Sequence, residues 1–433
     1  MRLSADVLEA AAEAARPQAV GRVEAVVGLH LDVAGLDAAV GDAVCVDDRI
    51  EAEVVAVRDG GVVCMPLGDL TGIKAGAPVA SRGKAGTVRV GWPLLGRVVD
   101  GLGRPLDGLP LPAGLDPVSV DGKAPHPLRR QPVDRPIGLG VRCLDTLVPA
   151  GRGQRLGIFA GSGVGKSSLL SMITRGTDAA VTVLALVGER GREVREFLDH
   201  DLGPEGLARA VVVVATSDEP ALVRLRAAAT ATRIAEWFRD QGEDVLLLMD
   251  SLTRCCMAQR EVGLSAGEPP VTRGYPPSVF GLLPKLLERA GAGEVGSITA
   301  LYTVLVDGDD HDEPIADAAR SILDGHIVLS RKLATAGHFP TVDVLESVSR
   351  VAPRVTTSEQ RAVATEVRRL LAAHRDARDL IDIGAYVAGS NPAVDRAVAL
   401  SEPIRSFLTQ DLAETTKAED AWSALAGVVG GWR

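Results

Sequence analysis

The 433-residue sequence has few aromatic residues and no block of basic residues. Phe, Trp and Tyr together make up 3% of the chain, so Val, Leu, Ile and Ala must form most of any core. The formal net charge at pH 7 is −10. Because proteins whose main task is nucleic-acid binding usually present a basic face, this balance argues against that class.

Cysteine usage and hydropathy indicate the compartment. The five cysteines include no CxxC or CxxxC pair, and the neighbours Cys255 and Cys256 are poorly placed for a structural disulfide. No uninterrupted apolar run reaches the roughly 18 residues that a membrane-spanning helix needs. Residues 1–16 lack the basic start and apolar core of a secretory signal. We therefore expect reduced thiols and a cytosolic protein.

The length favours roughly two to four domains, and the residue pattern changes along the chain. Residues 1–16 predict a short amphipathic helix that ends at Pro17. Residues 17–90 contain short β-runs separated by turns rich in Gly and Asp, which predicts a compact antiparallel barrel. Examples of the expected strands are 22–27, 43–46, 52–57 and 62–65.

Residues 91–350 predict an α/β domain with a mostly parallel sheet. Its first part, up to about residue 136, is rich in Gly and Pro and is expected to consist mainly of loops. Near-continuous apolar runs then predict strands that are buried on both faces, at 181–187, 210–215, 245–249 and 297–305. Helices are expected at 220–241 and 277–290. Residues 351–433 predict a separate helical domain, with helices at 358–375 and 393–410.

A phosphate-binding loop is the most informative motif of the sequence. The run Ala160-Gly-Ser-Gly-Val-Gly-Lys-Ser167 lies between a predicted strand at 155–159 and a predicted helix at 168–173. Glycines let the loop turn its N–H groups towards a phosphate, and the helix N-terminus adds positive potential. Lys166 would reach the β- and γ-phosphates, and the Ser167 hydroxyl would bind Mg²⁺. We assign nucleotide binding to Gly161, Ser162, Gly163, Val164, Gly165, Lys166, Ser167 and Ser168.

Two carboxylates would add hydrolysis to nucleotide binding. Asp250 ends an apolar strand, where a second acid helps to hold Mg²⁺. Glu189 follows another strand, and parallel sheets bind ligands at the carboxyl ends of their strands. Glu189 would therefore face the γ-phosphate and polarise an attacking water. The alternative, a charged loop held by surface ion pairs, fits Arg192 and Glu193 better.

From about residue 95 to residue 400, the chain resembles the ATPase subunit of flagellar and type III protein-export machines, which are related to the catalytic subunits of rotary ATP synthases. The matching segments are 95–103, 160–167, 188–197, 249–254, 258–261, 267–270, 274–280, 322–331 and 347–351. The resemblance implies a RecA-like core, a homohexamer, and ATP held between two subunits. It also implies that Glu189 is the catalytic glutamate and that Arg350 is an arginine finger acting on the neighbour's γ-phosphate.

The adenine pocket is less well defined by the sequence. Relatives stack the base on C-terminal side chains, and Tyr386 and Phe407 are the aromatic residues available there. Tyr386 could equally belong to the core. The acidic loop at 307–313 matches a family segment near the nucleotide, although most of its carboxylates could simply be solvated.

The function that this resemblance implies is ATP hydrolysis that energises protein export by the flagellar type III secretion apparatus. One alternative is a virulence-type injection system, although segments 257–261 and 336–340 look more flagellar. Another is a ring-shaped nucleic-acid translocase, which residues 20–90 disfavour because they contain no aromatic residue and few Lys or Arg. A third is a rotary ATPase subunit or a non-catalytic relative, and Glu189 argues against the non-catalytic form.

The resemblance also implies partners and a location. We expect a stator-like regulatory protein at the N-terminus, a central-stalk coiled-coil protein, export-gate membrane proteins, and exported substrates with their chaperones. No nucleic-acid partner is expected. The protein would be cytoplasmic and peripheral to the inner face of the cell membrane.

Overall fold

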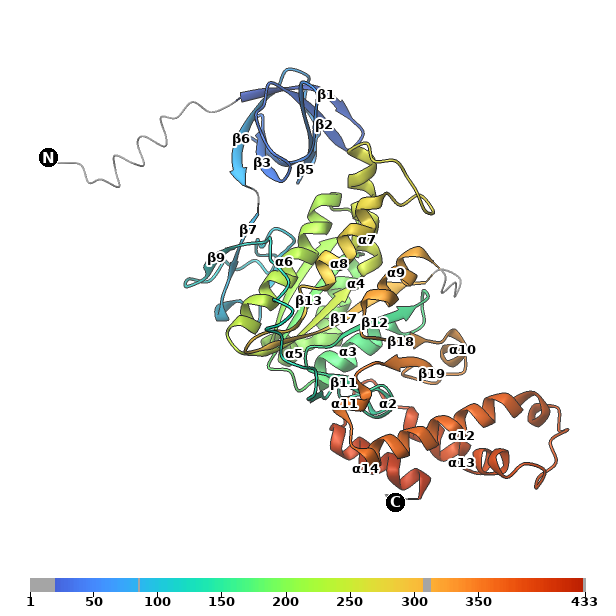
Figure 1. Cartoon of the computed structure of the whole chain (residues 1–433). Helices are drawn as coiled ribbons and strands as arrows, with labels where there is room; N and C mark the ends of the chain where they lie inside the picture. The colour runs from blue at the N-terminus through green and yellow to red at the C-terminus, as the bar shows by residue number, and fades with distance from the viewer. Residues whose placement is uncertain (1–19, 85, 307–312, 431–433) are drawn as a thin grey trace.

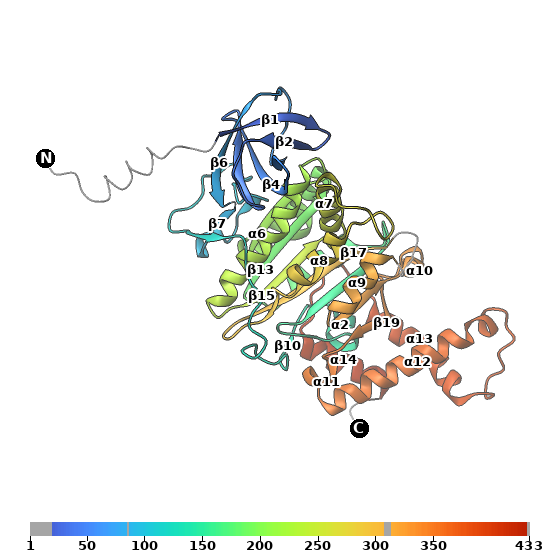
Figure 2. The same cartoon turned by 45° about the horizontal axis from the view of Figure 1, so that its top comes forward.

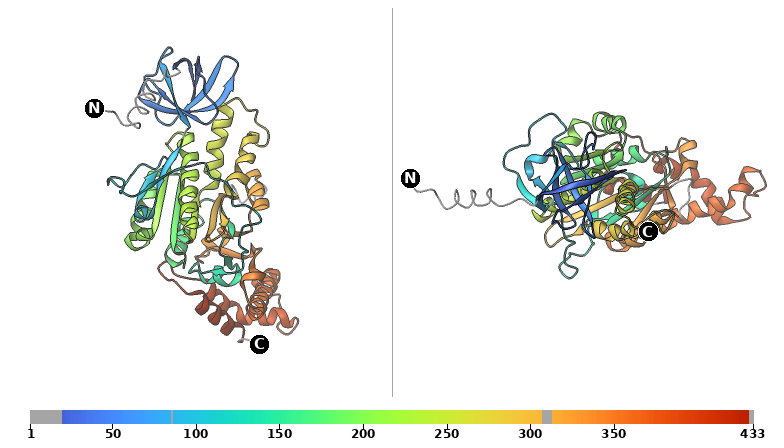
Figure 3. Two further views of the ribbon diagram at one scale, coloured as in Figure 1. Left: turned by 60° about the vertical axis from the view of Figure 1, so that its left-hand side comes forward. Right: turned by 90° about the horizontal axis from the view of Figure 1, so that it is seen from above.

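The structure is a computed structural model that describes residues 20–84, 86–306 and 313–430. A β-barrel lies at one end, an α/β unit in the middle and a group of helices at the other end (Figure 1; Figure 3). The predicted helix at 1–16 lies outside the described residues, as does the acidic loop apart from Glu313. The fold class predicted from the sequence is confirmed.

The barrel is built from short antiparallel strands. Its members are β1 (Val20–Val27), β2 (His30–Ala34), β3 (Asp42–Val46), β4 (Ile50–Arg58), β5 (Gly61–Pro66) and β6 (Pro78–Lys84). They close in the order β1-β2-β5-β4-β3-β6. The interior is filled mainly by small side chains at alternating positions, such as Ala52 and Val54, so the barrel needs no aromatic core. The four strands named from the sequence correspond to β1, β3, β4 and β5, and β2 and β6 complete the barrel.

The central sheet carries most of the fold. Its strands are β8 (Val98–Asp100), β12 (Arg155–Ala160), β13 (Val181–Glu189), β14 (Ala210–Thr216), β15 (Asp244–Asp250), β17 (Ser297–Leu305), β18 (Gly325–Leu329) and β19 (Val342–Ser349). The order is β19-β18-β12-β17-β15-β13-β14-β8, and β16 (Gly291–Ala292) pairs with β17. Along that order, as far as the described residues go, the pairs are parallel apart from β18 with β19.

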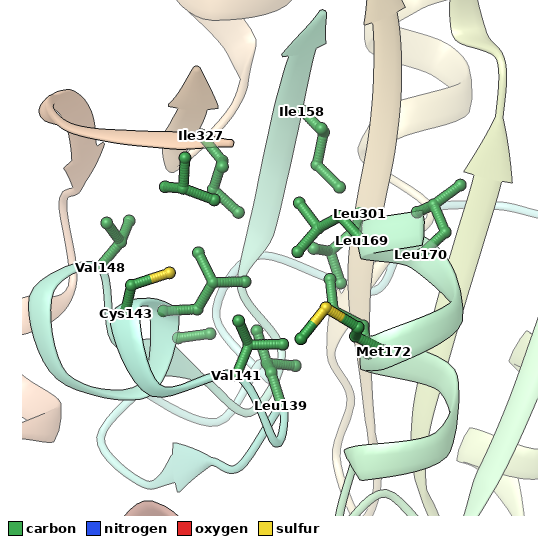
Figure 4. Packing of buried hydrophobic residues seen from close by; sticks show 14 of the residues in the cluster. Leu139, Val141, Cys143, Val148, Ile158, Leu169, Leu170, Met172, Leu301 and Ile327 are labelled. Atoms are coloured by element: carbon green, nitrogen blue, oxygen red, sulfur yellow. The ribbon is translucent and has the colours of Figure 1, made fainter. Parts of the chain in front are cut away.

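Helices cover both faces of this sheet, which explains the near-continuous apolar strands. Along β13, Leu184 and Leu186 belong to one core cluster, whereas Val183, Ala185 and Val187 belong to another. The flanking helices include α3 (Lys166–Gly176), α6 (Ala221–Asp240), α7 (Leu252–Ser265) and α8 (Pro277–Leu287). Figure 4 shows the first cluster, in which strand residues such as Ile158 and Leu301 pack close to Leu169 and Met172 of α3.

Residues 91–136 consist mainly of loops, as predicted, and contain a few short elements that the sequence did not reveal. The three-residue strand β8 joins the edge of the central sheet beside β14. The helical turn η1 (Trp92–Leu94) precedes it, and β9 (Asp116–Ser119) pairs with β7 (Thr87–Val90). Strands this short have no readable periodicity, so pairing with a distant strand is what defines them.

The C-terminal helices form an arm that extends away from the sheet (Figure 2). The long helices are α12 (Ser358–Asp382) and α13 (Pro392–Leu408), and α14 (Ala418–Val429) packs against both. Thr357 and Gln360 form a capping box that starts α12. The other short elements are β10 (Pro136–Ile137), α2 (Arg142–Leu147), β11 (Ala150–Gly151), α4 (Gly191–Glu196), η2 (Phe197–Leu202), α5 (Gly203–Ala208), α9 (Pro314–Ile322), α10 (Arg331–Thr335) and α11 (Ala352–Val355).

Two further observations concern the chain as a whole. All five cysteines are free and buried. In the part of the chain that the structure describes, none of the helices is both long enough and apolar enough to span a bilayer.

Candidate active site

The phosphate loop connects β12 to α3, as its motif predicts. Gly163 and Gly165 have φ values of 71° and 89°, a left-handed conformation that glycine adopts without strain. The amide of Leu169 donates to the carbonyl of Gly165, so regular helical hydrogen bonding starts at the end of the loop. The Thr341 hydroxyl donates to the carbonyl of Val164 at 2.5 Å. The loop is therefore held from both sides, with its helix N-terminus available to an anion.

The three charged residues expected to carry the chemistry lie together. Lys166 Nζ lies 2.5 Å from Asp250 Oδ1 and 3.4 Å from Glu189 Oε1. β13 and β15 are neighbouring parallel strands, so the two carboxylates come from the same edge of the sheet. The Thr303 hydroxyl donates to Asp250 Oδ1 at 2.7 Å and helps to hold that carboxylate in place.

The local backbone of β13 directs Glu189 out of the strand ladder. Gly188 has a φ of 74°, and the pairing with β14 shifts register between Val187 and Glu189. A Cβ on Gly188 would lie 2.9 Å from Cβ of Arg254. A larger residue before Glu189 would therefore meet both backbone strain and a steric clash.

Burial and neighbouring charges shift the pKa values of both Lys166 and Glu189. Burial alone lowers the pKa of Lys166, but the charges of Asp250 and Glu189 more than offset it, and the pKa is raised. The pKa of Glu189 is raised by burial and by the nearby charge of Asp250, against the opposing effect of Lys166. Lys166 thus stays charged, while Glu189 is a stronger proton acceptor than an ordinary glutamate.

A cavity of about 100 Å³ adjoins this cluster and gives room for water beside Glu189. It is lined by Ser167, Leu186, Glu189, Glu193, Val194, Glu196, Phe197, Asp201 and Asp250. The Ser167 hydroxyl and the Asp250 carboxylate therefore border the same small space, and both are hard oxygen ligands of the type that Mg²⁺ prefers.

Arg350 lies at the opposite edge of the sheet. Its amide donates to the carbonyl of Asp324 at 3.0 Å, and the amide of Asp324 donates to the carbonyl of Arg155 at 2.8 Å. Arg155 starts β12 and the phosphate loop follows its end, so Arg350 lies about 20 Å from Gly161 along the strand. The guanidinium is exposed and donates to the carbonyl of Arg320 at 3.3 Å. The structure therefore does not bring Arg350 to the phosphate loop of its own chain.

The structure does not support the aromatic residues suggested for the adenine pocket. Tyr386 lies in the connection between α12 and α13, where its hydroxyl donates to Asp395 Oδ1 at 2.9 Å. That connection lies at the far end of the helical arm (Figure 1). Phe407 is buried, with the guanidinium of Arg142 above its ring. Neither ring is placed beside the phosphate loop with an open face.

Phe339 is the aromatic residue that the sequence analysis missed. The residue is 38% exposed, and a ring carbon lies 3.4 Å from the place where a Cβ on Gly165 would be. An exposed ring beside a phosphate loop suits the stacking of a nucleobase. Phe339 is the sole aromatic residue between Tyr302 and Tyr386, and that isolation was the signal available in the sequence.

Comparison with known proteins identifies families for two parts of the chain. Residues 140–349 match the nucleotide-binding domain of the ATP synthase alpha/beta family. Residues 356–427 match the C-terminal domain of the T3SS EscN ATPase. The two matches cover the α/β unit and the helical arm.

Individual relatives agree over nearly the whole length. The flagellum-specific ATP synthase of Bacillus subtilis is 51% identical over 416 residues, which is 95% of each chain. A type 3 secretion system ATPase of Sinorhizobium fredii is 49% identical over 405 residues, covering 92% of this chain and 90% of the relative. The assembled ATPase EscN of enteropathogenic E. coli superposes with a TM-score of 0.91 at 46% identity, covering 95% of this chain and all of EscN. EscN in complex with its central stalk EscO gives a TM-score of 0.88 at the same identity and coverage. The chain thus belongs to the family of flagellum-specific and type 3 secretion system ATPases, within the ATP synthase alpha/beta family.

Proposed function

We propose that this protein hydrolyses ATP to energise protein export by a flagellar type III secretion apparatus. The observation that carries the proposal is the cluster of Lys166, Glu189 and Asp250 at the end of an intact phosphate loop. Several relatives named as flagellum-specific, with the one from Bacillus subtilis at 51% identity, support the flagellar assignment. The type 3 secretion relative at 49% identity keeps an injection system as the second candidate.

The catalytic cluster supports a specific division of labour. The loop amides and Lys166 would bind the phosphates of ATP, which must then compete with Asp250 for the lysine. Glu189 would accept a proton from the attacking water, for which its raised pKa suits it. Ser167 and Asp250 would hold Mg²⁺, which neutralises charge on the phosphates. Among the described residues, no group of three His, Cys, Asp or Glu side chains could hold a metal ion by itself, so the nucleotide and water would supply the other positions.

The distance between Arg350 and its own phosphate loop supports a shared active site. A residue that stabilises the transition state must touch the transferred phosphate, which Arg350 can do only in a neighbouring copy. The relative EscN has been solved as an assembled ATPase. We therefore propose a homohexamer in which each site combines the phosphate loop of one subunit with Arg350 of the next.

Base recognition is assigned to Phe339 in place of Tyr386. The ring of Phe339 lies beside Gly165, and its carbonyl accepts a hydrogen bond from the amide of Gln410 at 2.8 Å. Adenine would stack on the exposed face of this ring.

The proposed partners follow from the family. EscN was solved with its central stalk EscO, which supports a central-stalk coiled-coil partner for this chain as well. We further propose a stator-like regulatory protein at the N-terminus, export-gate membrane proteins, and exported substrates with chaperones. The protein would act in the cytoplasm at the inner face of the cell membrane.

A pull-down from cells with Glu189→Gln protein tests this proposal, because a hydrolysis-dead enzyme retains its nucleotide and its complexes. Flagellar export components in the eluate are the expected result. Components of an injection system would select the second candidate, and ribosomal or nucleic-acid partners would contradict both. Wild-type protein purified in parallel shows which partners depend on arrested turnover.

A further inference from the structure

The amino edge of the central sheet contains a buried amide that touches the surroundings of Arg350. Gln154 is fully buried and directly precedes β12. Its side-chain nitrogen donates to the carbonyl of Asp324 at 2.9 Å and to the hydroxyl of Ser349 at 3.2 Å. Its side-chain oxygen accepts from the amide of Gly151 at 2.9 Å. Both donors of the Gln154 amide group are therefore used on residues next to Arg350.

The two partners of Gln154 are the groups that hold the backbone of Arg350. The carbonyl of Asp324 accepts from Gln154 and also from the amide of Arg350. Ser349 directly precedes Arg350, and its hydroxyl donates to the carbonyl of Pro149 at 2.7 Å. The side chain of Arg350 is exposed, so its direction depends on how firmly this short stretch of backbone is held.

Gln154 also belongs to the segment that leads to the phosphate loop. β12 runs from Arg155 to Ala160, and its neighbours β17 and β18 hold it on both sides. A shift at the phosphate loop end of this rigid strand is therefore transmitted to Gln154, and from there to Asp324 and Ser349.

We propose that Gln154 is a positioning residue for Arg350. Gln154 lies at the start of the strand that leads to the subunit's own phosphate loop. Through its hydrogen bonds it also holds the backbone next to Arg350, which acts in the active site of the neighbouring subunit. Successive active sites in the ring would then be coupled through β12 and one buried amide. This inference rests on the proposed role of Arg350 in the neighbouring site.

The structure offers a matched control in Thr299 of β17. Thr299 is also fully buried, and its hydroxyl accepts from the amide of Gly153 at 2.9 Å. Gln154→Met and Thr299→Val each preserve side-chain bulk, and each leaves one buried amide of the 151–153 turn without its partner. Only Gln154 reaches Asp324 and Ser349. Because Gln154→Met removes three hydrogen bonds, it should lower the melting temperature at least as much as Thr299→Val, and only Gln154→Met should disturb Arg350.

The first measurement is ATPase kinetics on the assembled full-length protein. Gln154→Met should lower kcat by about 10- to 100-fold, as expected for a misplaced catalytic group, with little change in the KM for ATP. Thr299→Val should stay within about twofold of wild type, since it touches no group around Arg350. Adding Gln154→Met to Arg350→Ala should cause no further loss, because both act on one group. An equal loss in the two matched variants, or additive losses in the double variant, would overturn the proposal.

Mixed rings separate an effect on the neighbour from an effect on the subunit's own loop. Gln154→Met subunits have an intact loop and a displaced arginine, whereas Lys166→Ala subunits have a dead loop and a well-placed arginine. Adding Lys166→Ala subunits should raise the activity of Gln154→Met, as it should for Arg350→Ala. If it rescues Arg350→Ala alone, Gln154 acts on its own loop and the inference is wrong. If Lys166→Ala subunits raise the activity of neither variant, Arg350 does not act in the neighbouring site, and the inference about Gln154 is wrong as well.

Discussion

The two edges of the central sheet differ in the charged groups that they bring together. At the carboxyl edge, Lys166, Glu189 and Asp250 come from three elements of one chain, and Lys166 already contacts both carboxylates. At the amino edge, Arg350 presents an exposed guanidinium whose hydrogen-bond partner is a backbone carbonyl. In the proposed function, the first edge would bind and activate ATP, and the second would place its cation in the site of a neighbouring copy. An enzyme assembled from two such half-sites would be active only when copies meet.

The largest expected effect comes from removing the cation of the carboxyl edge. Lys166→Ala should reduce hydrolysis below detection, because no other described side chain in the cluster neutralises the β- and γ-phosphates. The assay is phosphate release at saturating ATP, with circular dichroism to check that the fold is retained. If Lys166→Ala hydrolysed ATP near the wild-type rate, the carboxyl edge would not be the place where the phosphates bind.

Removing the cation of the amino edge should be almost as damaging. Arg350→Ala is expected to lower kcat by about 10³- to 10⁵-fold, the usual range for an arginine finger. Wild-type specific activity should rise with protein concentration as rings form, and the measurement is activity against concentration alongside light scattering. A specific activity that stays constant on dilution to monomers would show that the site is complete in one chain.

Glu189 tests the proton chemistry of the carboxyl edge. Glu189→Gln should lower kcat by about 10²- to 10⁴-fold, because the amide cannot accept the proton of water. In the wild type, kcat/KM should fall as pH falls through the raised pKa of Glu189, at a higher pH than the value of about 4.3 for an ordinary glutamate would give. A pH–rate profile measures this limb. If the Gln variant keeps the same acid limb, another group is responsible.

The smallest effect concerns the base. Phe339→Ala should raise the KM for ATP by about 10-fold and leave kcat nearly unchanged, consistent with the ~1–3 kcal/mol of a base–aromatic stack. Tyr386→Ala is the comparison variant and should leave KM unchanged, since its hydroxyl bonds to Asn391 and to Asp395 in the first turn of α13, at the far end of the helical arm. Steady-state kinetics on both decides the assignment, and the reverse pattern would restore Tyr386 as the base-stacking residue.

Much of the carboxyl edge was predictable because its signals are local. The phosphate loop is one continuous run, and Asp250 and Glu189 each end an apolar strand that is recognisable by itself. Once the strands are parallel, their carboxyl ends must meet at one edge. The short distances from Lys166 to Asp250 and Glu189 agree with the expectation that both carboxylates lie at the carboxyl edge of the sheet, near the phosphate loop.

The amino edge and the base site were not predictable in the same way. Arg350 is an ordinary surface arginine until the antiparallel pairing of β19 with β18 places it beside the start of β12. Phe339 is an isolated aromatic residue in the sequence, and only the packing of its segment on Gly165 makes it a candidate for base stacking. β8 is recognised only by its pairing with β14.

The sequence alone determined the fold class, the phosphate loop and its two carboxylates, because apolar periodicity, glycine conformation and motif spacing act over a few residues. Only the tertiary structure decided that Arg350 lies at the edge of the sheet opposite its own phosphate loop, that Phe339 borders that loop and that Gln154 contacts both Asp324 and Ser349 beside Arg350. Those relations depend on strand order and register, which are set by burial and pairing between segments far apart in the chain.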